Sequence, residues 1–281
     1  MTAEENQAPA HPFYLDVDGG RRFCLYHAPH PNRECAGTVL YVHPFGDEMN
    51  SARRMAALQS RAFSAMGFGV LQIDLFGCGD SDGELRDVSW ELWKQDLAAA
   101  AKWLRKQAGT ELLMWGLRLG ATLAIDFARS SKEAIDCLLL WQPVINGQAY
   151  MNQFLRIQLA GNMLAQNGNG TATMQNPRKS LAAGEVVEAG GYELTPALVE
   201  AIGNVNLTNL SGLHMPIHWF EISERVTAER AAVLNAWIEN GVDVHLRQVH
   251  CSSFWSSPEI RESPQLVSAT SAILPKRLYE C

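Results

Sequence analysis

The sequence predicts an α/β fold: one domain with a mainly parallel sheet of about eight strands, helices on both faces and an inserted helical cap. Short apolar runs alternate with segments of helical periodicity, which is typical of a parallel sheet covered on both faces. The chain has 281 residues, of which 47% are hydrophobic and 19% charged, so one large core is expected. The alternation breaks once, between about 145 and 213, which indicates an insertion.

The first half of the chain predicts a hairpin followed by alternating strands and helices. The hairpin turns at Asp18-Gly19-Gly20. Ser51 and Ser89 are the expected N-caps of the first two helices, and Gly67 and Gly109 stand near their ends. Strands are expected over 37–45, 69–77, 111–116 and 135–144, and helices over 51–68, 89–109 and 121–131.

The insertion is polar and loop-rich, and residues 166–177 contain too much Asn and Gly for regular structure. Strands at 216–222 and 242–249 and helices at 228–241 and 264–274 are expected after it. We therefore assign 1–144 and 214–281 to the core, and 145–213 to a cap over the carboxyl ends of the strands, where such folds bind ligands.

Composition excludes several classes of protein. The formal net charge of −7 argues against general binding to nucleic acid or to anionic membranes. The chain has no apolar run long enough to span a bilayer and no N-terminal signal peptide pattern. Its six cysteines are scattered without a CxxC pair, so we expect reduced thiols, a cytoplasmic location, and neither metal nor cofactor.

One turn carries most of the functional information. Gly116-Leu117-Arg118-Leu119-Gly120 lies between a buried strand and a helix, and its glycines indicate a sharp turn whose backbones approach too closely for a Cβ. The central residue of such a turn is strained and points into a pocket. Arg118 cannot act there as a nucleophile, because a guanidinium stays protonated, but its five N–H donors suit a carboxylate or phosphate.

This layout resembles the α/β-hydrolase fold. Within that fold the chain is similar to the second group of hydrolases associated with the exosortase A (PEP-CTERM) system of bacteria. The resemblance implies an acyl or ester hydrolase linked to exopolysaccharide or protein-sorting metabolism. The matching segments are "HPFGDEMNSARRM", "DLFGCGDSDGEL", "WGLRLGATLA", "AGGYELTPAL" and "FWSSPEI".

The resemblance also assigns site residues. Arg118 takes the place of the nucleophilic serine, and the following acid and histidine would be Glu224 and His250. Glu221 is the alternative acid, and the usual aspartate spacing falls on Arg225.

The resemblance implies that the oxyanion hole consists of the backbone N–H groups of Phe45 and Leu119, which do not depend on side chains. Arg118 and His43 are the predicted ligand-binding side chains. A displaced nucleophile at Cys78, Ser81 or residues 251–253 is disfavoured, because none of these follows a strained turn.

Three functions remain open on the sequence. The chain is a hydrolase that uses water activated by His250, a pseudo-hydrolase that binds a small anionic or acyl ligand or a pathway partner, or a scaffold in which Arg118 pairs with an internal acid. The internal candidates for such a pair are Asp47, Glu48, Glu221 and Glu224.

Overall fold

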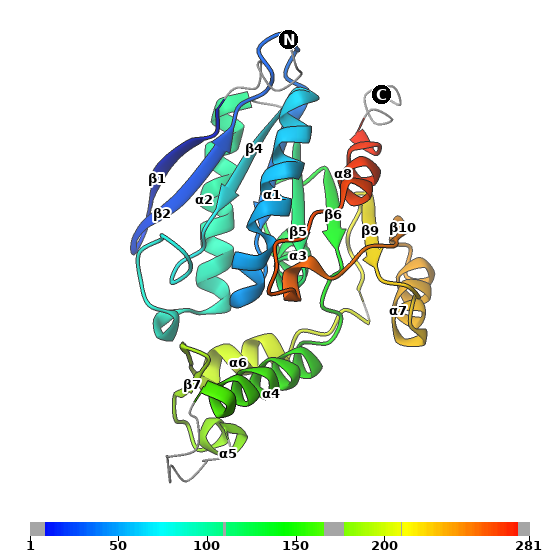
Figure 1. Cartoon of the computed structure of the whole chain (residues 1–281). Coiled ribbons are helices and arrows are strands. Elements are labelled where there is room, and N and C mark those ends of the chain that lie inside the picture. The colour runs from blue at the N-terminus through cyan, green and yellow to red at the C-terminus, as the bar shows by residue number, and fades with distance from the viewer. Residues whose placement is uncertain (1–8, 109–110, 166–176, 209, 275–281) are drawn as a thin grey trace.

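The computed structural model describes residues 9–108, 111–165, 177–208 and 210–274 (Figure 1). In this part of the chain the main sheet has eight strands, in the order β1-β2-β4-β3-β5-β6-β9-β10. The pairs β1/β2 and β2/β4 are antiparallel and the others are parallel, which confirms the predicted architecture. The strands are β1 (His11–Val17), β2 (Gly20–His27), β3 (Gly37–Val42), β4 (Phe68–Ile73), β5 (Leu112–Leu117), β6 (Cys137–Trp141), β9 (Ile217–Ile222) and β10 (Val244–Val249).

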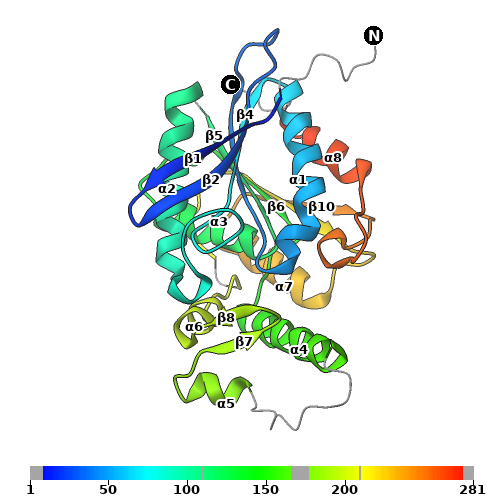
Figure 2. The ribbon, with the colours of Figure 1, turned by 60° about the vertical axis from the view of Figure 1, so that its left-hand side comes forward.

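Helices cover both faces of the sheet, and each face has its own hydrophobic cluster (Figures 1 and 2). One cluster joins the sheet to α1 (Asp47–Ala65), the short helix η2 (Phe254–Ser256) and α8 (Pro264–Ser271). The other joins it to α2 (Trp90–Ala108), α3 (Leu119–Ser130) and α7 (Ala228–Glu239). Strands β3, β5, β6 and β9 are buried at every position, which explains their continuous apolar runs.

The start of α1 differs from the sequence prediction. The helix begins at Asp47 with Gly46 as its N-cap, so the assignment of Ser51 as N-cap is wrong. Asp47 and Glu48 occupy the first turn, where acidic side chains interact favourably with the helix dipole. Ser89 is confirmed as a cap, since its Oγ accepts a hydrogen bond from the N–H of Leu92 at 3.1 Å. Gly109 lies outside the described residues.

The segment between β6 and β9 forms a separate layer beyond the carboxyl ends of the parallel strands (Figures 1 and 2). Strands β7 and β8 pair antiparallel with each other and do not join the main sheet. The prediction that residues 166–177 lack regular structure falls almost entirely outside the described residues, since only residue 177 is described. The division of the chain into core and cap stays a prediction. The segment contains α4 (Gly147–Ala165), α5 (Pro177–Ala182), β7 (Val187–Ala189), β8 (Tyr192–Leu194) and α6 (Pro196–Gly203).

Aromatic and polar contacts join this insertion to the loop after β3. The ring of Phe45 packs against Phe154 of α4 and Tyr192 of β8, with centroid distances of 5.1 and 6.2 Å. The Tyr192 hydroxyl donates a hydrogen bond to Asp47 at 2.9 Å. The insertion therefore rests on the same loop and first helical turn that border the strand ends.

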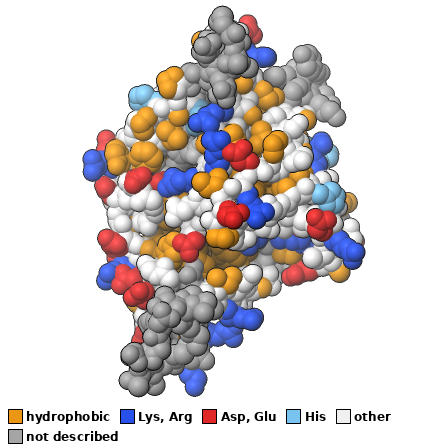
Figure 3. Space-filling model, in the orientation of Figure 1, with side chains coloured by type: hydrophobic (Ala, Val, Ile, Leu, Met, Phe, Trp, Pro, Cys, Tyr) orange, Lys and Arg blue, Asp and Glu red, His pale blue; other side chains and the backbone are white. Residues whose placement is uncertain are grey.

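Charged side chains are interspersed over the surface. On the face shown in Figure 3, the Lys and Arg side chains of the described residues alternate with Asp and Glu and do not form one continuous basic area.

Arg22 and Asp96 form an ion pair that is buried instead of lying at the surface. The pair joins β2 to α2, both side chains have 0% exposure, and the Nε–Oδ1 distance is 2.7 Å.

Asp96→Asn is expected to lower the free energy of unfolding by about 3–5 kcal/mol, because it leaves the buried Arg22 guanidinium without a charged partner. The control is Glu262→Gln, which breaks an exposed pair with Arg54 and should cost less than about 1 kcal/mol. Urea unfolding followed by tryptophan fluorescence measures both. Equal effects of the two substitutions would contradict the importance of this buried pair.

Candidate ligand-binding site at the strand–helix turn

The turn between β5 and α3 holds Arg118 in a strained backbone conformation. Its φ of 56° and ψ of −120° lie in a region that residues with a side chain seldom adopt. The Arg118 N–H donates to the carbonyl of Trp141 at 2.9 Å, and the Arg118 carbonyl accepts from the N–H of Ala121 at 3.1 Å. Bonds to the neighbouring strand and to the helix thus fix this conformation.

The two glycines of the turn are required by close packing, as the sequence predicts. A Cβ on Gly116 would lie 2.4 Å from the Cα of Ala121. A Cβ on Gly120 would lie 2.3 Å from the carbonyl oxygens of Val42 and His43. Helix α3 therefore packs directly against the backbone at the end of β3.

The Arg118 side chain lines a cavity of about 620 Å³ between the strand ends and the insertion. This volume is in the range of small-molecule sites. Its walls combine charged, amide, hydroxyl and aromatic side chains from α1, α4, the end of β6 and the loop after β10. They are Asp47, Glu48, Ser51, Arg118, Gln142, Tyr150, Gln153, Phe154, Ile157, Ser253, Trp255, Ser256, Ser257 and Pro258.

Arg118 contacts one internal carboxylate, and it does so through one nitrogen. The Nε atom of Arg118 donates to Oε1 of Glu48 at 3.2 Å. The hydroxyl of Tyr150 donates to the other oxygen, Oε2, at 3.3 Å. Among the described residues, Nη1 and Nη2 of Arg118 donate no hydrogen bond to the protein. The guanidinium is therefore oriented by Glu48 without a bidentate pair.

Two aromatic rings flank the guanidinium. The Cζ atom of Arg118 lies 5.4 Å from the ring centroid of Trp255 and 5.6 Å from that of Tyr150. At these distances the ring faces attract the cation. The Arg118 and Glu48 side chains are 15% and 18% exposed, so water screens their ion pair only in part.

Burial shifts the pKa values of the groups around Arg118. The pKa of Glu48 is raised above its usual value, because the effect of burial is the largest. The charge and hydrogen bond of Arg118 and the hydrogen bond of Tyr150 act in the opposite direction and lower this pKa in part. Burial, and next the charge of Glu48, raises the pKa of Tyr150 well above its usual value. The Tyr150 hydroxyl therefore stays protonated and acts as the donor to Glu48.

Glu221, the alternative acid, is buried in a polar cluster. Its carboxylate accepts hydrogen bonds from Gln142 Nε2, Trp219 Nε1 and Ser223 Oγ at 3.0–3.2 Å, and from Arg230 Nη1 at 3.1 Å. With 1% exposure and four donors it has little capacity to orient a further group.

The predicted acid and histidine lie close to each other, but at the surface. His250 Nδ1 is 3.9 Å from Glu224 Oε2, and the two side chains are 62% and 91% exposed. Neither residue lines the cavity that contains Arg118. The loop after β10 instead places Trp255 beside Arg118. A catalytic role for Glu224 and His250 stays a prediction.

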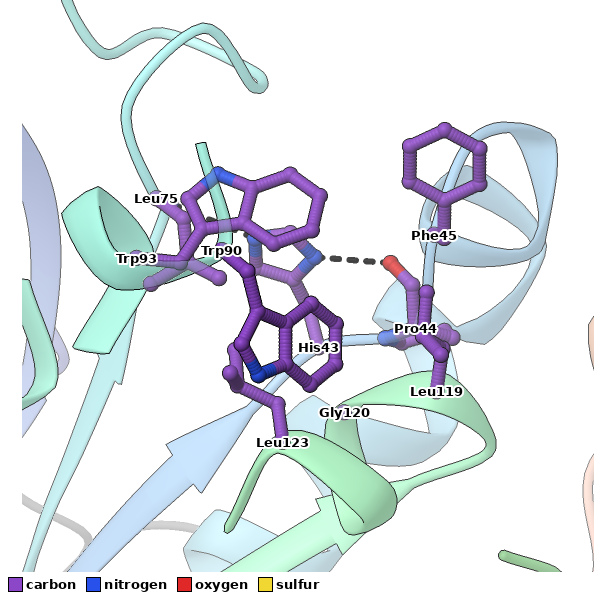
Figure 4. A pocket seen from close by; sticks show the side chains of 9 residues that line it. All are labelled: His43, Pro44, Phe45, Leu75, Trp90, Trp93, Leu119, Gly120 and Leu123. Carbon is purple, nitrogen blue, oxygen red and sulfur yellow. Dashed lines mark hydrogen bonds between the residues drawn. The ribbon is translucent and has the colours of Figure 1, made fainter. Parts of the chain in front are cut away.

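The predicted oxyanion donors belong to residues that line a second, small hollow of about 10 Å³ (Figure 4). This volume is close to that of one water molecule. Among the described residues, the backbone N–H groups of Phe45 and Leu119 have no protein acceptor. One of these donors thus lies in the turn and the other in the loop after β3, and their role as an oxyanion hole stays a prediction.

His43 lies beside these donors, but both of its ring nitrogens are used by the backbone (Figure 4). Nδ1 donates to the carbonyl of Pro44 at 2.7 Å, and Nε2 accepts from the N–H of Leu75 at 3.2 Å. Burial lowers the pKa of His43, so the ring is neutral. The ring joins the loops after β3 and β4, and it offers no further nitrogen to a ligand.

The alternative nucleophiles are bound into the loop structure. Ser81 Oγ donates to the carbonyl of Asp74 and accepts from the N–H of Phe23. Burial, followed by the charges of Asp74 and Asp96, raises the pKa of Cys78 to about 12, and burial also raises the pKa of Cys251. Both thiols are therefore protonated at neutral pH and poorly reactive.

Two important cavity residues, Tyr150 and Trp255, were not predicted from the sequence. Tyr150 falls in the insertion, whose direction relative to the sheet no local pattern indicates. Trp255 belongs to the matching segment "FWSSPEI", but the expected spacing assigned the functional position after β10 to His250.

The described residues contain no group of three or more His, Cys, Asp or Glu side chains suited to a metal ion. None of the described helices is long and apolar enough to cross a membrane.

The strand order, the strained turn after β5 and the insertion after β6 define an α/β-hydrolase fold. Est1E from Butyrivibrio proteoclasticus, in its structure with ferulic acid bound, matches with a TM-score of 0.69 and 16% identity, over 95% of this chain and 100% of that one. A soluble variant of monoglyceride lipase from Saccharomyces cerevisiae, in complex with a substrate analog, matches with a TM-score of 0.65 and 13% identity, over 98% of each chain.

The sequence relationship is more specific. The family model of the serine aminopeptidases, S33, matches residues 33–182, which is more than half of the chain. The chain therefore belongs to this family of α/β hydrolases, which is of the serine hydrolase type. Human protein ABHD12B is 27% identical over 131 residues, which are 45% of this chain and 34% of ABHD12B. The match thus spans about a third of that relative.

Negligible turnover of small activated esters is expected, because no side chain at the turn can form an acyl intermediate. Arg118→Ser should not restore turnover, since Trp255 and Tyr150, rather than a histidine, flank this position. Stopped-flow assays with nitrophenyl acetate, and labelling by a fluorophosphonate, measure both. A burst of product from the native chain, or from Arg118→Ser, would disprove this expectation.

Proposed function

We propose that this protein binds a small carboxylate at Arg118 and does not cleave esters through an acyl-enzyme. The observation that carries the proposal is the arrangement of the guanidinium. Nε is held by Glu48, whereas Nη1 and Nη2 donate no hydrogen bond among the described residues. The two terminal nitrogens of a guanidinium match the two oxygens of a carboxylate. In this proposal Arg118 occupies the position of the serine nucleophile.

The charge of the cavity favours a ligand with a single negative charge. Glu48 compensates the charge of Arg118 in part, and Asp47 is a second acid in the lining. A multiply charged phosphate would be repelled by these acids more strongly than one carboxylate. The ligand is therefore a monocarboxylate rather than a nucleotide or a sugar phosphate.

The proposal gives the insertion a role as a cap, with 1–144 and 214–281 as the core and 145–213 as the cap. Tyr150, Gln153, Phe154 and Ile157 of α4 supply one wall of the cavity. They would exclude water from the ligand and thereby strengthen its pairing with Arg118. His43 is not part of the proposed site, because both of its nitrogens are engaged.

The resemblance to exosortase-associated hydrolases suggests the cellular context of this binding. We propose that the protein acts in exopolysaccharide or protein-sorting metabolism, as a pseudo-hydrolase that holds an acidic small molecule of that pathway. A cytoplasmic location is part of the same proposal.

Slow hydrolysis by water is the second candidate function. It is favoured by the N–H groups of Phe45 and Leu119, which have no protein acceptor in the described chain and would stabilise an oxyanion. This function lacks a general base within the cavity to activate water, because His250 does not line the cavity. Binding is therefore the better supported function.

Arg118→Gln is expected to abolish binding of ferulic acid, the acid bound in the Est1E structure, as measured by calorimetry. It should lower the free energy of unfolding by no more than about 2 kcal/mol, because the pair with Glu48 is partly exposed. The control is Arg129→Gln at the other end of α3, an exposed arginine that should leave binding unchanged. A larger loss of stability, with no ligand bound by the native protein, would favour the scaffold function.

Glu48→Gln is expected to tighten ferulate binding about fivefold, because it removes roughly 1 kcal/mol of competing ion pairing while keeping an oxygen for Nε. In the native protein, affinity should rise as the pH falls from neutral through the raised pKa of Glu48, since protonation leaves the charge of Arg118 uncompensated. The rise should end near pH 4, about where the ligand itself is protonated. Calorimetry over this range, in the native protein and the variant, measures both effects. The proposed role of Glu48 would be contradicted if the affinity of the native protein decreased as the pH was lowered from neutral. Weaker binding by the variant would also contradict it.

A further inference from the structure

We infer that Trp255 and Tyr150 make the Arg118 site selective for flat aryl carboxylates over saturated acids of the same size. This inference rests on the proposed function and specifies the ligand class for that site. The inference rests on two observations about the site. Two buried aromatic rings lie beside the guanidinium of Arg118. A carboxylate that pairs with this guanidinium lies in its plane.

A carboxylate that accepts two hydrogen bonds from Nη1 and Nη2 lies in the plane of the guanidinium. The Cζ atom of Arg118 lies over the rings of Trp255 and Tyr150, 5.4 and 5.6 Å from their centroids. Both residues also line the cavity that a carboxylate on Arg118 would occupy, so a bound ligand contacts these rings. A flat, conjugated acid keeps its ring in the plane of its carboxylate and stacks on them, whereas a puckered saturated ring fits less closely.

Both rings are fixed before any ligand binds. Trp255 is 5% exposed and packs edge-on against Phe254, which in turn packs against Trp141 of β6. Tyr150 is 7% exposed and is held by its hydrogen bond to Glu48. Preorganised rings contribute to affinity without a cost for ordering side chains on binding.

The remaining wall is consistent with an aryl ligand. Phe154 packs at 63° against Tyr192 and also contacts Phe45, so its ring is fixed by the core and the insertion together. The cavity volume of about 620 Å³ exceeds the need of a single benzoate ring, which favours an acid with a spacer between ring and carboxylate. Cinnamate is the simplest acid of this kind.

The test compares cinnamate with cyclohexylpropanoate, which has the same carbon skeleton and carboxylate but a saturated spacer and a saturated, puckered ring. Calorimetry on the full chain should show that cinnamate binds on the order of tenfold more tightly. Trp255→Leu should reduce this ratio severalfold, with Tyr150 retaining part of the preference, while cyclohexylpropanoate still binds. Trp255→Phe and Tyr150→Phe, which retain a ring, should keep most of the preference.

Three results would overturn the inference. Equal affinities of the native protein for the two acids would exclude aryl selectivity, and this result does not depend on how any variant folds. Equal weakening of both acids by Trp255→Leu would assign Trp255 a merely structural role. Failure of both acids to bind the native protein would remove the proposed function itself, and the inference with it.

Discussion

The close approach of α3 to the end of β3 is the constraint on which the site depends. Gly120 stands so near the carbonyls of Val42 and His43 that any side chain would displace the helix. The chain must therefore turn sharply between β5 and α3, and the residue at the turn must accept a positive φ. Because this backbone is fixed by sheet and helix packing, whatever side chain occupies the turn faces the ligand cavity. The fold thus keeps its geometry when the chemistry of that side chain changes.

Placing an arginine at this position creates an electrostatic problem that α1 and the insertion solve together. A partly buried guanidinium needs a counter-charge, and Glu48 supplies it from the first turn of α1. Tyr150 holds the second oxygen of Glu48, so that the contact with Arg118 is made through Nε. The insertion therefore takes part in orienting the guanidinium as well as in enclosing the cavity.

The surroundings of the turn also suit an arginine. Trp255 packs on the cation, and no histidine is among the residues that line this cavity. Glu221 is instead a structural anion that holds Gln142 and Arg230 at the ends of β6 and α7. Gln142 itself has a positive φ, so this cluster stabilises a second strained residue at the cavity wall. The loops of an α/β-hydrolase fold thus surround a guanidinium with one counter-charge and two aromatic rings.

Local pattern determined the eight strands, most helices, the hairpin and the glycine-flanked turn, because periodicity and steric needs are properties of short segments. It also placed Arg118 at the centre of that turn and named Glu48 among its possible partners. Spacing alone failed for the start of α1, because the cap there is set by the path of the loop rather than by a nearby serine. Tertiary structure alone decided which acid reaches Arg118, how many of its nitrogens are used, and which rings flank it. Those outcomes depend on side chains far apart in the sequence, from residue 48 to residue 255, and only the packing of the insertion and the loop after β10 against the strand ends brings them together.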